Sequence, residues 1–177
     1  MTTEKYTNTA VLLHWIMAIL IICMIVMGMY MEDLPKGTAE RTWWFTLHKS
    51  IGLTLGLLAI ARLGWKIFNP APALPDFVKA SHRKISTIVH HSLYLLLFLQ
   101  PLTGYISSSF SGYKTKFWGI PLYHWGWKSP ELNEFFTNLH EFCAVLLIAL
   151  IGLHIVGFAM HMKNGEYEIL KRMWFIR

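Results

Sequence analysis

Four long apolar runs constrain the fold of this 177-residue chain more than any other feature. They cover roughly 9–31, 46–68, 85–108 and 138–161. Each is close to the ~20 residues that cross a hydrocarbon layer about 30 Å thick as an α-helix. Only helices and closed barrels satisfy their backbone hydrogen bonds in lipid, and continuous runs of this length predict helices. We therefore expect an all-α integral membrane four-helix bundle, a single domain over residues 1–177.

The charged residues indicate how this bundle is oriented. They make up 15% of the chain, against roughly 25% in soluble domains. The net charge is +6, but the basic residues lie between the apolar runs and form no single patch, so nucleic acid is not an expected partner. Ten of the sixteen Lys and Arg fall in the two terminal segments and the second connection. The positive-inside rule then predicts that both termini are cytoplasmic.

The third connection, from Ser109 to Asn138, contains the aromatic stretch "KTKFWGIPLYHWGWKSPE". Trp and Tyr favour the headgroup zone of a bilayer. We expect this connection to lie against the outer membrane surface.

Nine histidines are unusual in so apolar a chain, and two of them bound the segment "HEFCAVLLIALIGLH". On an α-helix the fourteen residues from His140 to His154 advance about 21 Å and end ~40° short of four full turns. The two histidines therefore share one face of the fourth helix, one near each leaflet. This spacing predicts two sites stacked across the membrane.

Each site needs a partner histidine from another helix. In the outer leaflet the candidate is His48, whereas the inner leaflet offers His14, His90 and His91, among which spacing does not decide. Imidazoles that face each other across a bundle are the axial ligands of a b-type haem. Two haems at different depths would form an electron path across the bilayer.

These histidines could also have a structural role or bind a metal ion. A lone histidine near a helix end can snorkel or bond a carbonyl, but ionisable groups inside membranes tend to be functional. Zinc usually gathers three or four ligands in one place, whereas these histidines separate into two levels with only Glu141 and Cys143 beside one of them. Haem is the better fit, and the absence of a CxxCH motif argues against covalent attachment.

An arginine and a set of glycines could either contact haem or have an ordinary structural role. Arg62, near the cytoplasmic end of the second helix, could pair with a haem propionate or with a lipid phosphate. Four glycines could admit a porphyrin edge or allow close helix packing; they are Gly52, Gly56, Gly152 and Gly157.

Several stretches together resemble the bacterial cytochrome b561 family of four-helix, di-haem membrane proteins. They are "LLHWIMA", "LHKSIGL", "HHSLYLLLFLQPLTGY", "LHEFCA", "GLHIVGFAMHM" and "LKRM", and they cover nearly the whole chain. This family is related to the cytochrome b subunits of membrane hydrogenases and formate dehydrogenases. The resemblance implies a multi-pass protein of the bacterial inner membrane that binds two haem b groups.

The resemblance also implies roles for individual histidines. It pairs His14 with His154 for the inner haem iron, and His48 with His140 for the outer one. His90 matches a family histidine that is not a ligand, and it could contact a propionate or a quinone. His91 is interpreted as structural, His161 as a reserve ligand, and His82 and His124 as surface residues.

For function, the resemblance implies an oxidoreductase that takes electrons from periplasmic superoxide and reduces ubiquinone. The alternative is a relay without catalysis of its own, which passes electrons between quinone and a partner dehydrogenase, hydrogenase or soluble cytochrome. A four-helix transporter would need broken helices or acidic residues at mid-membrane, and the sequence contains neither.

Overall fold

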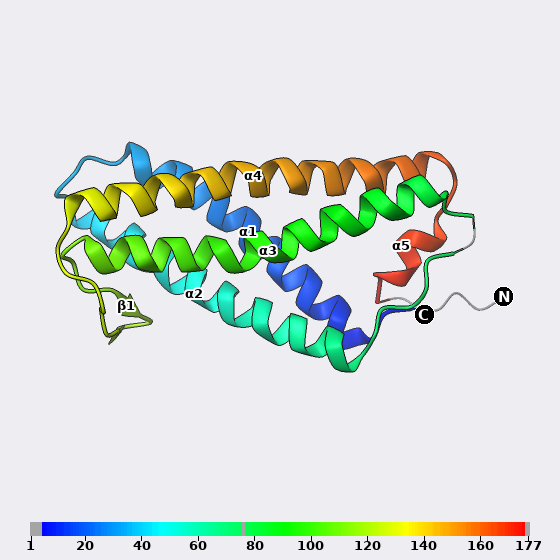
Figure 1. Cartoon of the computed structure of the whole chain (residues 1–177), viewed down its shortest axis with the longest axis horizontal. Helices are drawn as coiled ribbons and strands as arrows, with labels where there is room; N and C mark the ends of the chain where they lie inside the picture. The colour runs from blue at the N-terminus through cyan, green and yellow to red at the C-terminus, as the bar shows by residue number, and fades with distance from the viewer. Residues whose placement is uncertain (1–4, 76, 176–177) are drawn as a thin grey trace.

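The computed structural model describes residues 5–75 and 77–175 and consists mainly of four long antiparallel helices (Figure 1). The elements are α1 (Asn8–Asp33), α2 (Ala39–Phe68), α3 (Ala80–Phe110), β1 (Lys116–Phe117), β2 (Ile120–Pro121), α4 (Pro130–Lys163) and α5 (Glu168–Arg172). The four long helices are each long and apolar enough to cross a membrane. The expected membrane four-helix bundle is confirmed, and within the described residues the small hairpin β1–β2 is the one departure from an all-α fold.

Three of the long helices begin at a hydroxyl side chain that caps the first turn. Thr7 accepts a hydrogen bond from the backbone N–H three residues on, at 3.3 Å, and Thr38 and Ser129 do the same at 3.2 and 3.4 Å. Such caps satisfy N–H groups that have no partner within the helix. Pro130 follows Ser129 at the start of α4, where its missing N–H costs nothing.

The two ends of the bundle differ in content. One end holds the first and the last residues that the structure describes, the connection between α2 and α3, and α5 (Figure 1); we call it the terminal end. The other holds the connection between α1 and α2 and the hairpin connection between α3 and α4; we call it the loop end. The expected common side for both termini agrees with this arrangement, and the assignment of the terminal end to the cytoplasm stays a prediction.

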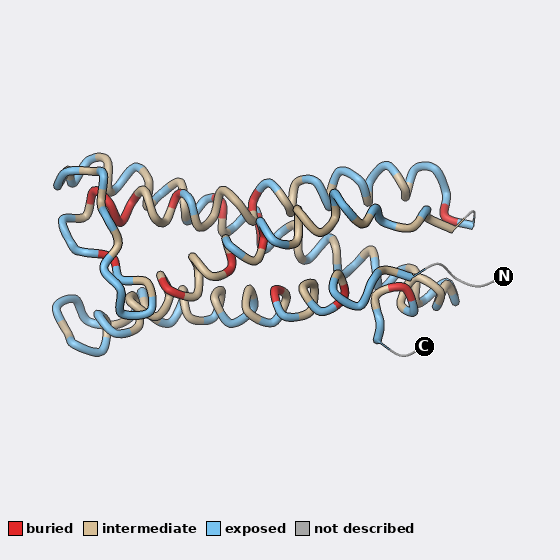
Figure 2. The backbone as a smooth tube through the Cα atoms, turned by 90° about the horizontal axis from the view of Figure 1, so that it is seen from below, coloured by how far each residue is buried: buried red, intermediate tan, exposed pale blue. Residues whose placement is uncertain are grey.

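Little of the chain is buried by the chain itself (Figure 2). The helices pack closely as α1 with α2, α2 with α3, and α3 with α4. Large apolar side chains face outward along all four helices, with Val26 62% and Val145 65% exposed. An apolar surface of this extent would be unstable in water, and lipid is the solvent that it suits.

Two small apolar clusters hold the helices together. One contains Met17, Leu55 and Ala59, and the other contains Leu96, Cys143 and Leu147. Both lie midway along the helices, where they hold the centre of the bundle together.

The glycines of α2 serve close helix packing. A Cβ added to Gly56 would lie 3.2 Å from Cγ of Pro101, which sits inside α3, and one added to Gly52 would lie 3.4 Å from Cε of Met24. Gly152 and Gly157 on α4 have no described side-chain neighbour within 4 Å of an added Cβ. The packing interpretation therefore holds for the pair on α2.

The hairpin at the loop end is fixed to α2. Its turn places Trp118 at φ 48° and Gly119 at φ 91°, and positive φ is unusual for a bulky residue. Ser50 Oγ accepts from the Trp118 backbone N–H at 3.1 Å, and Thr54 Oγ1 accepts from its indole N–H at 3.1 Å. These two bonds to α2 hold the turn in its conformation.

Candidate functional site

Histidine rings meet across the bundle at two levels. At the loop end the ring centres of His48 (α2) and His140 (α4) are 6.3 Å apart, with 78° between the ring planes. At the terminal end the centres of His14 (α1) and His154 (α4) are 6.2 Å apart, at 70°. All four residues are half-buried. The structure thus brings together the two predicted pairs, each on the same face of α4.

At the loop-end pair, α3 fixes the ring of His140. Its Nδ1 lies 2.8 Å from the backbone oxygen of Gln100, to which an Nδ1–H donates. That bond leaves the lone pair on Nε2, where the side-chain N–H of Gln100 approaches to 3.2 Å. A histidine held in this way presents Nε2 as an acceptor or as a metal ligand.

Glycine makes room for the rings at this level. A Cβ added to Gly104 would lie 3.0 Å from both Nδ1 and Cε1 of His140, and one added to Gly28 would lie 3.7 Å from Cε1 of His48. Nδ1 of His48 is buried and has no hydrogen-bond partner in the described protein. A buried polar atom that the protein leaves unsatisfied calls for an explanation, and a bound group beside it is one.

Cations rather than carboxylates surround the terminal-end pair. An Nη2–H of Arg62 donates to Nδ1 of His14 at 3.0 Å. The guanidinium of Arg62 lies 5.5 Å from the ring centre of Tyr94, and the ammonium of Lys66 lies 4.8 Å from the same ring. Arg62 therefore points into the bundle beside His14 and not outward to a lipid phosphate.

A third histidine ring lies beside this pair. The ring centre of His90 is 5.1 Å from that of His154, at 88°. Nδ1 of His90 donates to the backbone oxygen of Ser86 at 2.6 Å. His91 makes the equivalent bond to Thr87 at 2.8 Å and faces outward.

The remaining histidines occupy the two ends. Nδ1 of His161 pairs with the Glu166 carboxylate, and its ring centre lies 6.2 Å from that of His82 in the first turn of α3. At the loop end, Nε2 of His124 accepts from the Thr115 backbone N–H at 2.9 Å. Burial, and then the charge of Lys49, hold the pKa of His124 below its usual value.

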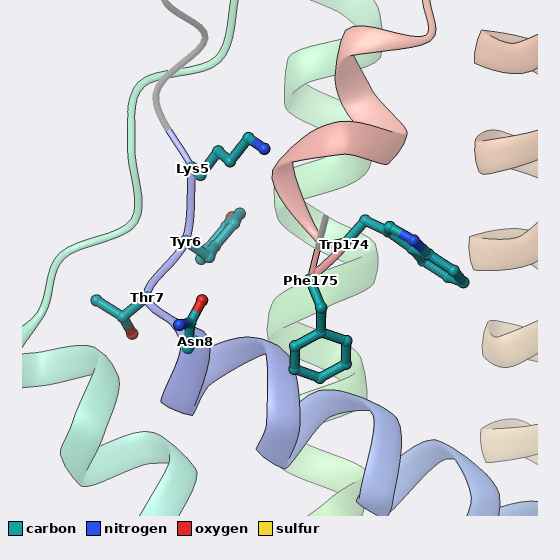
Figure 3. A pocket seen from close by; sticks show the side chains of 6 residues that line it. All are labelled: Lys5, Tyr6, Thr7, Asn8, Trp174 and Phe175. Atoms are coloured by element: carbon teal, nitrogen blue, oxygen red, sulfur yellow. The ribbon is translucent and has the colours of Figure 1, made fainter. Parts of the chain in front are cut away.

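The C-terminal segment packs against Trp15, the chain neighbour of His14. The ring of Trp15 lies 5.4 Å from that of His14, and the indole N–H donates to the backbone oxygen of Met173 at 2.9 Å. Trp174 packs edge-on against Trp15 at 5.7 Å. A cavity of about 290 Å³ lies between this segment and the N-terminal segment (Figure 3); its walls are Lys5, Tyr6, Thr7, Asn8, Trp174 and Phe175.

Sequence reasoning missed the α3 residues that contact His140. They are Gln100, Thr103 and Gly104, and the hydroxyl of Thr103 lies 3.3 Å from Nδ1 of His140. A signal was present, because Gln100 is the only side-chain amide in the third apolar run. Residues three and four positions further along share its helix face.

Four membrane-length helices with imidazoles facing across the bundle are the arrangement of membrane cytochromes of the b type. The family described as prokaryotic cytochrome b561 matches residues 5–175, and the chain belongs to this family. It is 28% identical to cytochrome b561 homolog 2 of Escherichia coli (strain K12), over 97% of this chain and 92% of that protein. It is 24% identical to cytochrome b561 homolog 1 of the same strain, over 96% and 97%.

Family membership confirms the resemblance seen in the sequence. The chain is a multi-pass membrane electron-transfer protein, and membership in a cytochrome b family implies haem b as its cofactor.

Proposed function

We propose that the chain holds two b haems, one between His48 and His140 and one between His14 and His154, and moves electrons from superoxide at the loop end to ubiquinone. The observation that carries this proposal is the pair of ring-to-ring distances, 6.3 and 6.2 Å, at two depths of one bundle. Haem b, when bound there, supplies the one-electron chemistry.

The distances suit two histidines that would hold one haem iron between them. Metal–imidazole bonds are about 2 Å long and the nitrogen lies about 1.1 Å from the ring centre, so two opposed imidazoles would have centres about 6.2 Å apart. Both pairs agree with this value to within about 0.1 Å. The 5.1 Å between His90 and His154 is too short for an iron between opposed rings, which favours His14 as the partner of His154.

The surroundings of the loop-end pair support the same assignment. The bond from His140 Nδ1 to the Gln100 carbonyl leaves Nε2 able to bind a metal, and Gly104 leaves room for the ring. His48 carries the unsatisfied ring nitrogen. At the terminal end, Arg62 has no ion-pair partner among the described residues and suits a propionate. His90, beside His154, suits the edge of the same group or a quinone.

A bound metal ion explains these histidines less well. Among the described residues there is no group of three or more His, Cys, Asp or Glu that could hold one. Structural and catalytic zinc sites draw at least three protein ligands together. The loop end brings two histidines together, and the third ring at the terminal end, that of His90, does not complete such a group with His14 and His154.

The proposed reaction is balanced, because superoxide donates the electrons that ubiquinone accepts. Each superoxide gives up one electron and leaves as O₂, and ubiquinone takes two electrons and two protons to become ubiquinol, so two superoxide anions reduce one quinone. In the predicted orientation the loop end faces the periplasm. Lysines on that face attract anions; they are Lys114, Lys116 and Lys128.

The first experiment counts and assigns the haems. Two per chain are expected, released as protohaem by extraction. Replacing His48 or His140 with Ala should remove one of two components in a redox titration of membranes, and replacing His14 or His154 should remove the other. His91→Ala is the matched control and should keep both. A His90→Ala variant that loses a component, while His14→Ala keeps it, would contradict the terminal-end pair.

The second experiment tests the substrate. Reduction by pulsed superoxide should be fast and should slow with salt, because charge steering can raise an anion's encounter rate tenfold or more and is screened over about 8 Å at physiological ionic strength. Charge reversal of Lys114, Lys116 and Lys128 should slow it further. Lys163→Glu reverses an exposed charge at the terminal end and should have little effect.

The outcome also decides between the enzyme and the relay. If superoxide reduces the haem slowly, and the rate depends on neither salt nor charge reversal, a relay between quinone and a partner protein is favoured. Exposed aromatics on the loop-end connection, with Tyr123 82% and Trp127 69% exposed, offer a surface for such a partner or for lipid headgroups. Co-purification from membranes with a stable redox partner would support the relay.

A further inference from the structure

Lys49 is a cation inside a membrane-length helix, where charged side chains are rare. It follows His48 on α2 and is half-buried. Its ammonium donates to the hydroxyl of Ser108 on α3 at 2.7 Å, and it forms no ion pair with any described residue. An uncompensated charge in such a place is costly, and charged groups kept inside membranes usually have a function.

The position of the ammonium relates it to the loop-end pair. Ser108 lies four residues beyond Gly104, which is about one helical turn, or 5.4 Å, toward the loop end. The ring of His140 rests on Gly104. Lys49 therefore holds its charge about one turn outside the level of His48 and His140, between that level and the loop-end surface.

The only hydrogen-bond partner of Lys49 among the described residues is neutral. Ser108 is 4% exposed, and its hydroxyl lies 2.5 Å from that of Thr115, which is 1% exposed. An ammonium has three N–H donors, and Ser108 accepts one. The ammonium does not snorkel outward to headgroups, because its one partner is a buried hydroxyl. A neutral side chain could link α2 to α3 equally well, so the charge itself needs another explanation.

We propose that Lys49 is the anion-binding residue of the loop-end site and holds a small oxyanion with its remaining N–H donors. The oxyanion is either a carboxylate of the group bound between His48 and His140 or a small free anion that arrives from the loop-end surface. The inference rests on the proposed function, since it requires a redox group at that pair. A cation there also favours the reduced state of that group, because it stabilises an added electron.

The test compares four forms of the haem-loaded protein by haem count and redox titration: wild type, Lys49→Met, Lys49→Arg and Lys36→Met. Lys36→Met is the control, because it removes the same charge from an exposed position at the loop end. Lys49→Met should keep both haems and shift the reduction equilibrium of the His48-dependent component tenfold or more toward the oxidised form. Lys49→Arg and Lys36→Met should remain within about twofold of wild type.

Added formate distinguishes the two sources of the oxyanion. For a free anion, formate shifts the His48-dependent component of the wild type saturably and leaves Lys49→Met unchanged. For a carboxylate of the bound group, formate has no effect, and reconstitution with the dimethyl ester of haem abolishes the difference between wild type and Lys49→Met. Selective loss of the His48-dependent haem in Lys49→Met, with the other component intact, also supports the bound carboxylate.

Two failures can be told apart. If wild type binds two haems, Lys49→Met titrates like wild type and formate has no effect, then Lys49 is not an anion-binding residue, while the proposed function stands. If wild type binds no haem that depends on His48, the proposed function fails and the inference fails with it.

Discussion

Replacing Gly104 with Ala tests the loop-end site with a single methyl group. The new Cβ would lie 3.0 Å from Nδ1 and Cε1 of His140 and 3.7 Å from Nε2. Carbon contacts are favourable at about 3.5–4.0 Å, so the ring must retreat by several tenths of an ångström. The bond from Nδ1 to the Gln100 carbonyl, now 2.8 Å, opposes that movement.

The magnitude follows from two opposing effects. Overpacking a close contact costs about 1–3 kcal/mol, and if this falls on the bound state it weakens haem binding at the loop-end pair about 5- to 150-fold. Alanine also has a better helix propensity than glycine by ~1 kcal/mol. That gain acts on the helix with and without haem, so it raises the stability of α3 but does not restore haem affinity.

The assay is a haem titration of the apoprotein in detergent, followed by a redox titration of the loaded protein. The Gly104→Ala variant should bind the terminal-end haem as wild type does and the loop-end haem more weakly. Gly152→Ala on α4 is the matched control, because an added Cβ there meets nothing within 4 Å. If Gly104→Ala fills both sites with wild-type affinity and midpoints, the loop-end haem does not depend on His140.

Two further predictions concern charge at the two ends. Because the pKa of His124 is lowered in the folded chain, the unfolded chain binds more protons just below pH 6.5, and acidification weakens the loop-end connection. After correction for its intrinsic pH dependence, hydrogen exchange of the Thr115 amide should speed up from about pH 7 to about pH 5. The absence of this change, or the same change in His124→Gln, would refute this. Arg62→Met should keep both haems and shift the terminal-end component about tenfold toward the oxidised form, with Arg62→Lys closer to wild type, whereas unchanged midpoints would contradict a role for the Arg62 charge.

The bundle could be predicted from hydropathy, but the true helix starts could not. α2 begins at Ala39 and α4 at Pro130, each about two turns before its apolar run begins. These first turns are polar, and hydropathy reports only the apolar segment. Local signals do mark them: Thr38 and Ser129 are capping residues, and Pro130 favours a first helical position. The hairpin was missed because its turn depends on hydrogen bonds that Trp118 donates to Ser50 and Thr54, which are distant in the sequence.

The two histidine levels followed from the spacing on one helix, whereas the choice of partners did not. Fourteen residues fix the relation between His140 and His154 because both lie on α4. The partner of His154 depends on how α1 and α3 are rotated against α4, and spacing along each chain segment does not report rotation. In the structure both His14 and His90 approach His154, and a difference of about 1 Å in ring distance separates them.

The distribution of packing explains why electrons, and not ions, would cross this bundle. The two buried apolar clusters lie between the histidine levels on every helix. The matching segments 15–31, 50–61, 92–107 and 142–153 contain no Asp, Glu, Lys or Arg. An ion entering this layer would lose its hydration and meet no fixed partner. An electron can pass between redox groups at the two histidine levels while the apolar layer between them stays closed. Under the proposed function, the cations Lys49 and Arg62 would stabilise an added electron near the two levels, and the layer between them stays apolar.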